Sequence, residues 1–84
     1  MNKIVEIEVL NNYHVWIKFQ DDVEKIVNLK PFLGKGFTAE LLNLDNFKKV
    51  QIESGGGLSW YNDYDFCPNF LRDYVPLEQI EELA

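Results

Sequence analysis

The sequence predicts an α+β domain: an antiparallel sheet of about five strands, one short helix after the third strand, and a C-terminal helical tail. Two observations predict it. Apolar and polar residues alternate with a period of two through much of the chain, which is typical of half-buried strands, whereas helical spacing appears only in short segments. Pairs of Asn, Asp or Gly residues separate these stretches, as turns do. We expect the 84 residues to form a single domain over residues 1–84.

The first two strands are predicted at residues 5–9 and 13–19, joined by a turn at Asn11 and Asn12. A two-residue loop would put the apolar faces of the two strands on opposite sides of the sheet. A three-residue loop over residues 11–13 puts them on one side, so burial favours it. This register pairs Val9 with Val15, Ile7 with Ile17, Val5 with Phe19, and Glu6 with Lys18.

A third strand is predicted at about residues 24–29, after a turn at Asp21 and Asp22. Pro31 ends it, because proline cannot donate a hydrogen bond to a ladder. The alternation within this strand is too weak to fix its register against the second strand. The third strand therefore enters the sheet without a predicted pairing.

The second half of the chain is predicted to hold a short helix and a hairpin. Thr38 is a suitable N-cap for a helix that ends at Asn43, since Asp45 and Asn46 favour a break there. Two apolar stretches then flank a glycine-rich loop, which indicates two antiparallel strands. These strands are predicted at residues 48–53 and 58–61, with the loop at residues 54–57.

A single helical turn is predicted at residues 68–72, and a helical tail is predicted to follow it at residues 73–84. Leu77 and Ile80 lie on one apolar stripe of this tail. Glu81 and Glu82 stand in its last turn, where the helix dipole disfavours negative charge, and so short a helix is marginal alone. We expect the tail to fray unless it docks against another surface.

The charge balance argues against several classes of partner. Fourteen acidic against eight basic residues give a net charge of −6, which repels phosphate backbones, so no nucleic-acid partner is expected and a basic protein fits better. No apolar run approaches the ~20 residues of a membrane span, and the start of the chain has no signal-peptide pattern. With a single cysteine, Cys67, these features favour the cytoplasm.

A longer pattern resembles a known bacterial family. The sequence Trp-x-x-Gly-x-Asp-x-x-Pro-x-x-Leu is matched here by Trp60, Asp65, Pro68 and Leu71, with Asp63 in the place of the glycine. An earlier aromatic followed by Asp-Gly is matched by residues 19–22, with Asp22 in the place of the glycine. These motifs resemble the family called domain of unknown function 2442, over about residues 5–72.

The resemblance implies a small α+β domain without established catalytic residues. It implies structural roles for the four matching motif residues. It also implies that the chain is encoded beside another small protein, in an arrangement similar to toxin–antitoxin pairs. Aspartate tolerates a positive φ better than most residues, so Asp22 and Asp63 are expected to keep the two glycine turns at some cost.

Trp16 is the most informative single residue of the chain. In the favoured register it projects from the polar face of the first hairpin, beside Glu8 and near His14. An exposed indole there calls for a cover: the tail stripe of Leu77 and Ile80, a partner protein or second copy, or a small ligand. We interpret the chain as a protein-binding module, and the family resemblance implies that it acts as an antitoxin-like partner of a neighbouring small protein. Its candidate protein-interaction residues are Trp16, His14, Glu8, Leu77 and Ile80.

The alternative is a small ligand-binding or catalytic domain that uses Asp63 and Asp65 with three nearby aromatics, Trp60, Tyr61 and Tyr64. Paired carboxylates can bind a cation or transfer protons, but the spacing here lacks further metal ligands. Asp65 is better placed to cap the helical turn at Pro68. His14 and Cys67 could form a nucleophilic pair only if the fold joined them. We therefore expect no enzyme activity, metal or cofactor.

Overall fold

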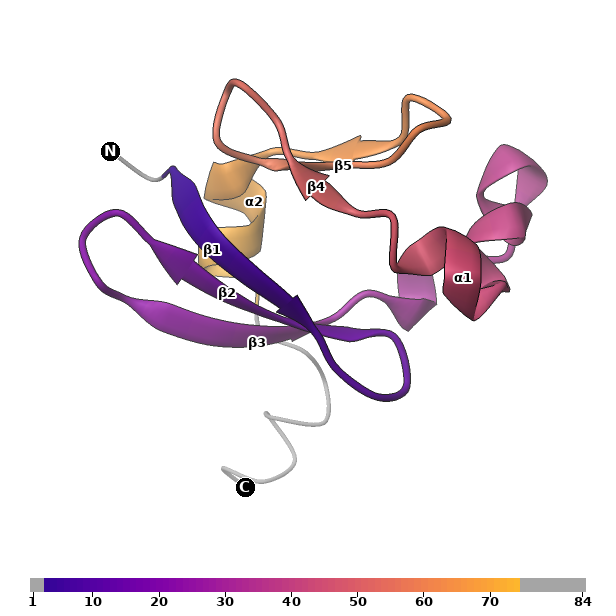
Figure 1. The fold of residues 1–84 in the computed structure, drawn as a ribbon, viewed down its shortest axis with the longest axis horizontal. Coiled ribbons are helices and arrows are strands. Elements are labelled where there is room, and N and C mark those ends of the chain that lie inside the picture. The colour runs from indigo at the N-terminus through magenta and orange to yellow at the C-terminus, as the bar shows by residue number, and fades with distance from the viewer. Residues whose placement is uncertain (1–2, 75–84) are drawn as a thin grey trace.

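The structure, a computed structural model, describes residues 3–74 and arranges them in two layers (Figure 1). The first layer is the antiparallel sheet β1–β2–β3, and the second is the smaller antiparallel sheet β4–β5–β6 with helix α2 beside it. The fold is therefore α+β, as predicted, but the prediction of one sheet of about five strands is wrong. The chain leaves β3 through three short helices, and the second half then stacks on the apolar face of the first sheet instead of extending its edge.

The first hairpin joins β1 (Ile4–Val9) to β2 (His14–Phe19). The Leu10 N–H donates to the His14 carbonyl at 2.8 Å and closes the ladder, which leaves the predicted three-residue loop at residues 11–13. Within this loop Asn12 and Tyr13 have positive φ values, 58° and 62°. The register confirms the pairs Val9–Val15, Ile7–Ile17 and Glu6–Lys18.

The predicted pairing of Val5 with Phe19 is wrong. The register shifts between Ile4 and Glu6, so Ile4 lies opposite Phe19 and is buried, while Val5 is 49% exposed. One extra residue in a strand reverses the side-chain alternation beyond it, and the period-two pattern alone does not reveal such an irregularity.

Strand β3 (Glu24–Asn28) pairs with β2 and forms the edge of the first sheet. Val27 lies opposite Val15 and both are fully buried, whereas Ile26 lies opposite Trp16 on the other face. Lys25 is on the inner face with Val27 and is partly buried. This sheet therefore has one buried apolar face and one outer, mostly polar face.

Three short helices connect the layers: η1 (Lys30–Phe32), η2 (Gly36–Leu42) and α1 (Leu44–Phe47). The prediction that Thr38 is the N-cap of a helix is wrong. Thr38 lies inside η2, where its Oγ1 donates to the Lys35 carbonyl at 2.7 Å. The predicted break at Asp45 and Asn46 is also wrong, because both lie in α1, whose N-cap Asn43 accepts from the Asp45 N–H at 2.9 Å. Two short helices replace the single predicted one.

The second sheet consists of three two-residue strands, β4 (Gln51–Ile52), β5 (Leu58–Ser59) and β6 (Asp65–Phe66). The β4–β5 hairpin and its glycine loop were predicted, although with longer strands. Strand β6 was not predicted. It forms because the turn after Trp60 reverses the chain, with the Trp60 N–H donating to the Tyr64 carbonyl at 2.9 Å and Asp63 at a φ of 68°.

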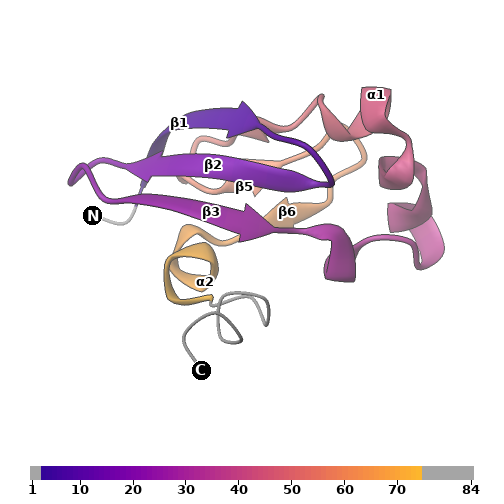
Figure 2. The same ribbon diagram turned by 90° about the horizontal axis from the view of Figure 1, so that it is seen from below.

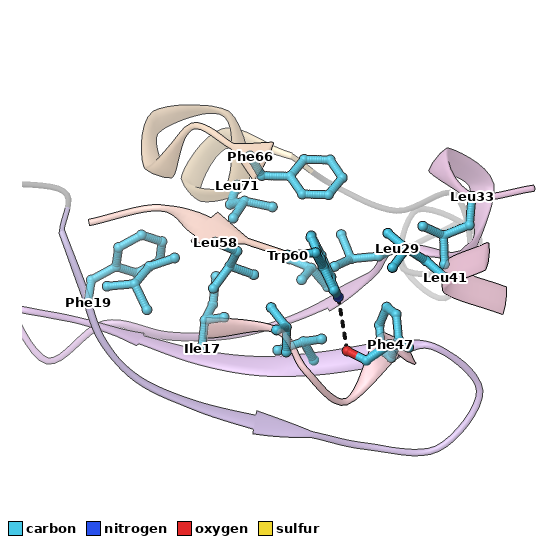
Figure 3. Close-up of a cluster of buried hydrophobic side chains, with 14 residues drawn as sticks. Ile17, Phe19, Leu29, Leu33, Leu41, Phe47, Leu58, Trp60, Phe66 and Leu71 are labelled. Carbon is cyan, nitrogen blue, oxygen red and sulfur yellow. Dashed lines mark hydrogen bonds between the residues drawn. The ribbon is translucent and has the colours of Figure 1, made fainter. Parts of the chain in front are cut away.

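The hydrophobic core lies between the two sheets (Figure 3). Trp60 stands at its centre with 2% of its surface exposed, and its indole N–H donates to the Phe47 carbonyl at 3.0 Å. Its ring packs against Phe47, Tyr64 and Phe66, with centroid distances of 5.8–5.9 Å. Leu71 of α2 is fully buried in the same core. The family-motif residues Trp60 and Leu71 are thus core residues.

Helix α2 (Pro68–Asp73) includes the predicted helical turn and lies alongside β3 (Figure 2). Pro68 begins it and Cys67 is its N-cap, without a side-chain capping bond, so the prediction that Asp65 caps this helix is wrong. Asp65 instead pairs with Ser59 in the second sheet and is exposed. The predicted tail of residues 73–84 lies outside the described residues from residue 75 onward, and with it Leu77 and Ile80.

Candidate functional site

Trp16 lies on the outer face of the first sheet, as the sequence predicts. In β2 the residues Val15, Ile17 and Phe19 are fully buried, and Trp16 alternates with them on the opposite face, where it is half-buried. Its cross-strand neighbours are Glu8 on β1 and Ile26 on β3. In Figure 2 this face turns toward the viewer, and no described element lies over it.

Two neighbours of Trp16 on β3 were missing from the predicted site. The Trp16 indole N–H donates to Glu24 Oε1 at 3.0 Å, so the polar end of the ring has a partner inside the chain. Ile26, directly opposite Trp16, is 44% exposed and extends the apolar surface toward the sheet edge. Both residues stand on the same face of the strand whose register the sequence left open, and only the pairing of β3 brings them to the indole.

We call this surface the Trp16 face. It consists of the half-buried Trp16 indole, the exposed Ile26 side chain and the acidic residues around them. The acidic residues are Glu6, Glu8 and Glu24, and all three are exposed. Lys18 lies between Glu6 and Glu24 in the cross-strand row next to Trp16. Its Nζ is 4.0 Å from Glu6 Oε1 and 3.6 Å from Asp22 Oδ1. The Trp16 face therefore combines an apolar centre with a negative surround.

His14, predicted near Trp16, is half-buried at the start of β2, and its side chain contacts the backbone of the β1–β2 turn. Its Nδ1 lies 2.9 Å from the Asn12 carbonyl and 3.2 Å from the Asn11 carbonyl, so the protonated Nδ1 tautomer can donate to both. This geometry gives His14 a structural role in the turn. It shares the outer face of β2 with Trp16 and lies at the end of the strand.

The residues of the alternative site are divided between the core and the surface. Trp60 and Tyr64 are oriented by bonds to backbone carbonyls, the Tyr64 hydroxyl donating to Phe32 O at 3.0 Å. Burial raises the pKa of the Tyr64 hydroxyl. Asp63 occupies the turn and Asp65 the short strand, and both are exposed. Within residues 3–74 there is no pocket beside them and no cluster of metal-ligating side chains.

Tyr61, the third aromatic of the alternative site, is a surface residue. It is 52% exposed, and Lys49 Nζ lies 5.0 Å from its ring centroid. The carboxylate of Glu40 raises the pKa of its hydroxyl. Cys67, the other member of the candidate nucleophilic pair with His14, is exposed at the N-cap position before α2. Within the described part of the chain, these residues thus share no concave site.

No helix within the described part of the chain has the length and apolar character of a membrane span.

Comparison with known proteins gives one finding. Neither a curated protein nor a solved structure matches the chain. A family model described as "Protein of unknown function (DUF2442)" matches residues 4–76, which is most of the chain. This range includes both sheets and α2. The chain therefore belongs to the DUF2442 family.

Proposed function

We propose that this protein is a protein-binding module whose Trp16 face recognises a basic partner. The observation that carries the proposal is the pair of Trp16 and Ile26 on a sheet face over which no described element lies. A pair of apolar side chains that keeps part of its surface in solvent, as half-buried Trp16 and exposed Ile26 do, is a site that a partner can desolvate. Tryptophan is among the residues that contribute most to such interfaces.

The charge around the pair supports a basic partner. Glu6, Glu8 and Glu24 surround the indole, and the whole chain carries a net charge of −6. Complementary charges mainly speed the encounter and suppress wrong partners, while the buried apolar centre provides the affinity. The same charge opposes binding to a phosphate backbone, which makes protein a better partner class than nucleic acid.

The first partner to test is the small protein encoded beside this chain, because the family resemblance implies such a neighbour. In the antitoxin-like form of the proposal, this chain holds that neighbour in an inactive complex in the cytoplasm. The role requires only binding, so no catalytic group is assigned to the chain.

The test is co-expression of this chain with its neighbour, followed by mass determination of the intact complex. We expect a stable heteromer, with at least about tenfold weaker binding for Trp16→Ala, as for a residue near the centre of an interface. Tyr61→Ala is the matched control, because Tyr61 is an exposed aromatic on the other layer. Two separate proteins at micromolar concentration, or equal loss of binding in both variants, would contradict the proposal.

A further inference from the structure

Among residues 3–74, no strand pairs with the outer edge of β3. The Phe19 N–H donates to the Val23 carbonyl at 2.8 Å and the Leu29 N–H to the Tyr13 carbonyl at 3.0 Å, one at each end of the β2–β3 ladder. Bonding to a neighbouring strand alternates by residue in an antiparallel pair, so the peptide groups of residues 24, 26 and 28 point away from β2. Within residues 3–74, no backbone hydrogen bond reaches them from outside the sheet.

Helix α2 lies next to this edge, on the inner side of the first sheet. Near one end of β3, Lys25 Nζ donates to the Arg72 carbonyl at 2.6 Å. Beyond the other end, the Phe32 ring contacts the rings of Phe70 and Tyr74, with centroid distances of 5.7 and 5.4 Å. Phe70 is 43% exposed. Figure 2 shows α2 beside the edge of β3, so a strand added to β3 would lie over this helix.

We propose that the β3 edge accepts one extended, basic segment of the partner protein as a fourth strand of the first sheet. This inference rests on the proposed function and names the mode of recognition. Main-chain bonds to Glu24, Ile26 and Asn28 would provide affinity, and alternate side chains would provide specificity. On the outer face, an apolar side chain would cover Ile26 and a lysine or arginine would meet Glu24. On the inner face, apolar side chains would rest on α2.

Charge and space favour this occupant over two others. The chain's own residues 75–84 carry Glu78, Glu81 and Glu82, which would lie against an acidic face. A second copy of the whole chain would bring its own second layer toward the space that α2 occupies beside the edge. A single basic strand meets neither obstacle.

The probe is an N-acetylated, C-amidated heptapeptide of sequence Thr-Lys-Val-Val-Thr-Lys-Thr, added to the ¹⁵N-labelled full chain. Paired antiparallel, its second valine lies opposite Ile26 and its second lysine opposite Glu24. The N–H of the second valine points toward β3, whereas that of the first valine points away. N-methylation of the second valine should therefore weaken binding at least about tenfold, and N-methylation of the first valine should have little effect.

The expected result is a shift and slowed hydrogen exchange of the Glu24, Ile26 and Asn28 amides. Glu24→Lys should weaken the lysine peptide about fivefold and favour a peptide with glutamate in place of lysine. Equal binding of the two N-methylated peptides, or unshifted edge amides, would overturn strand addition. Edge amides that are protected in the free chain and lose this protection when residues 75–84 are deleted would show that the chain's own C-terminal segment is the occupant. A molecular mass of the free chain that doubles with concentration would show that a second copy is the occupant. Either result would overturn the proposal.

These outcomes are separate from those of the proposed function. If a heteromer forms and depends on Trp16 while the edge amides stay unprotected, the Trp16 face binds the partner without strand addition. If no heteromer forms, the proposed function itself fails.

Discussion

Trp16 and Ile26 face each other across β2 and β3 in a non-hydrogen-bonded pair of the ladder, the position in which cross-strand side chains stand closest. Glu24, two residues earlier on the same face, accepts the indole N–H at 3.0 Å. The Trp16 ring, which β2 carries, is thus both hydrogen-bonded and flanked by residues of β3. Because β3 is the edge strand of the sheet in the described part of the chain, this geometry places the apolar centre of the Trp16 face next to the outward-pointing peptide groups of that edge.

Removing the indole acceptor should loosen Trp16 without unfolding the sheet. Glu24→Gln keeps an oxygen acceptor, whereas Glu24→Ala removes it from a partly solvated bond. We expect Glu24→Ala to lower the free energy of unfolding by at most about 1 kcal/mol, and Glu24→Gln by less. Urea unfolding monitored by circular dichroism measures both. A loss of several kcal/mol in either variant would show that Glu24 has a structural role beyond this bond.

The contact between Arg72 and Asp21 should make the docking of α2 sensitive to acid. The guanidinium donates to both carboxylate oxygens at 2.9 and 2.8 Å, and it lowers the pKa of Asp21 to about 2. Since the folded pKa lies below the unfolded value of 3.8, the stabilisation is present above pH 3.8 and is lost as the pH falls through about 2.

Asp21→Asn should therefore flatten the loss of stability between these two pH values, measured as urea midpoints across the range. Asp22→Asn is the control, because Asp22 is the neighbouring carboxylate and its Oδ1 lies 3.6 Å from Lys18 Nζ. Equal acid profiles for Asp21→Asn and the unmodified chain would show that this pair does not contribute to stability.

Asp63 occupies a turn that glycine would fill with less strain. Its φ is 68°, and its N–H donates to the Trp60 carbonyl at 3.1 Å to close the turn. We expect Asp63→Gly to stabilise the fold by about 0.5–1 kcal/mol, because the relief of a left-handed conformation exceeds the entropy that glycine adds to the unfolded chain. Asp63→Val should destabilise it. Thermal unfolding checks both, and a lower melting temperature for Asp63→Gly would contradict this account.

Gly57 is required by the close approach of two strands. A Cβ at this position would lie 2.1 Å from the Phe66 carbonyl oxygen, so the backbone of one of the two segments would have to shift. Gly57→Ala should therefore lower the free energy of unfolding by roughly 2–4 kcal/mol. In the same loop, a Cβ at Gly55 would meet only Glu53 Oε1, at 3.4 Å, so Gly55→Ala should cost under about 1 kcal/mol. Equal effects in a denaturant titration would rule out the strand contact as the cause.

The sequence predicts the first hairpin well because its pattern is strong on both strands. Burial of Val15 and Ile17 requires one register, and the structure has it. The left-handed turns at Asp22 and Asp63, with φ values of 71° and 68°, were also predictable from the family pattern, because glycine marks those positions. The position of Trp16 on the outer face followed from the same alternation.

The remaining features depend on contacts between distant residues. Strand β6 has two residues, too few for any periodicity, and pairs only after the Trp60 turn reverses the chain. Leu44 has helical spacing to Leu41 but is 50% exposed, because α1 is a separate turn that buries Phe47 instead. The acceptor role of Glu24 requires the β2–β3 register, which the weak alternation of β3 could not fix.

The central claim, that the Trp16 face binds a protein partner, is tested most directly by the two indole N–H signals of the ¹⁵N-labelled chain. Trp60 is buried and bonded to the Phe47 carbonyl, whereas Trp16 lies on the outer face and is bonded to Glu24, so the two signals report on the core and on the surface. When the proposed partner protein is added in excess, the Trp16 signal should shift while the Trp60 signal stays. A complex that leaves the Trp16 signal unchanged would contradict the account.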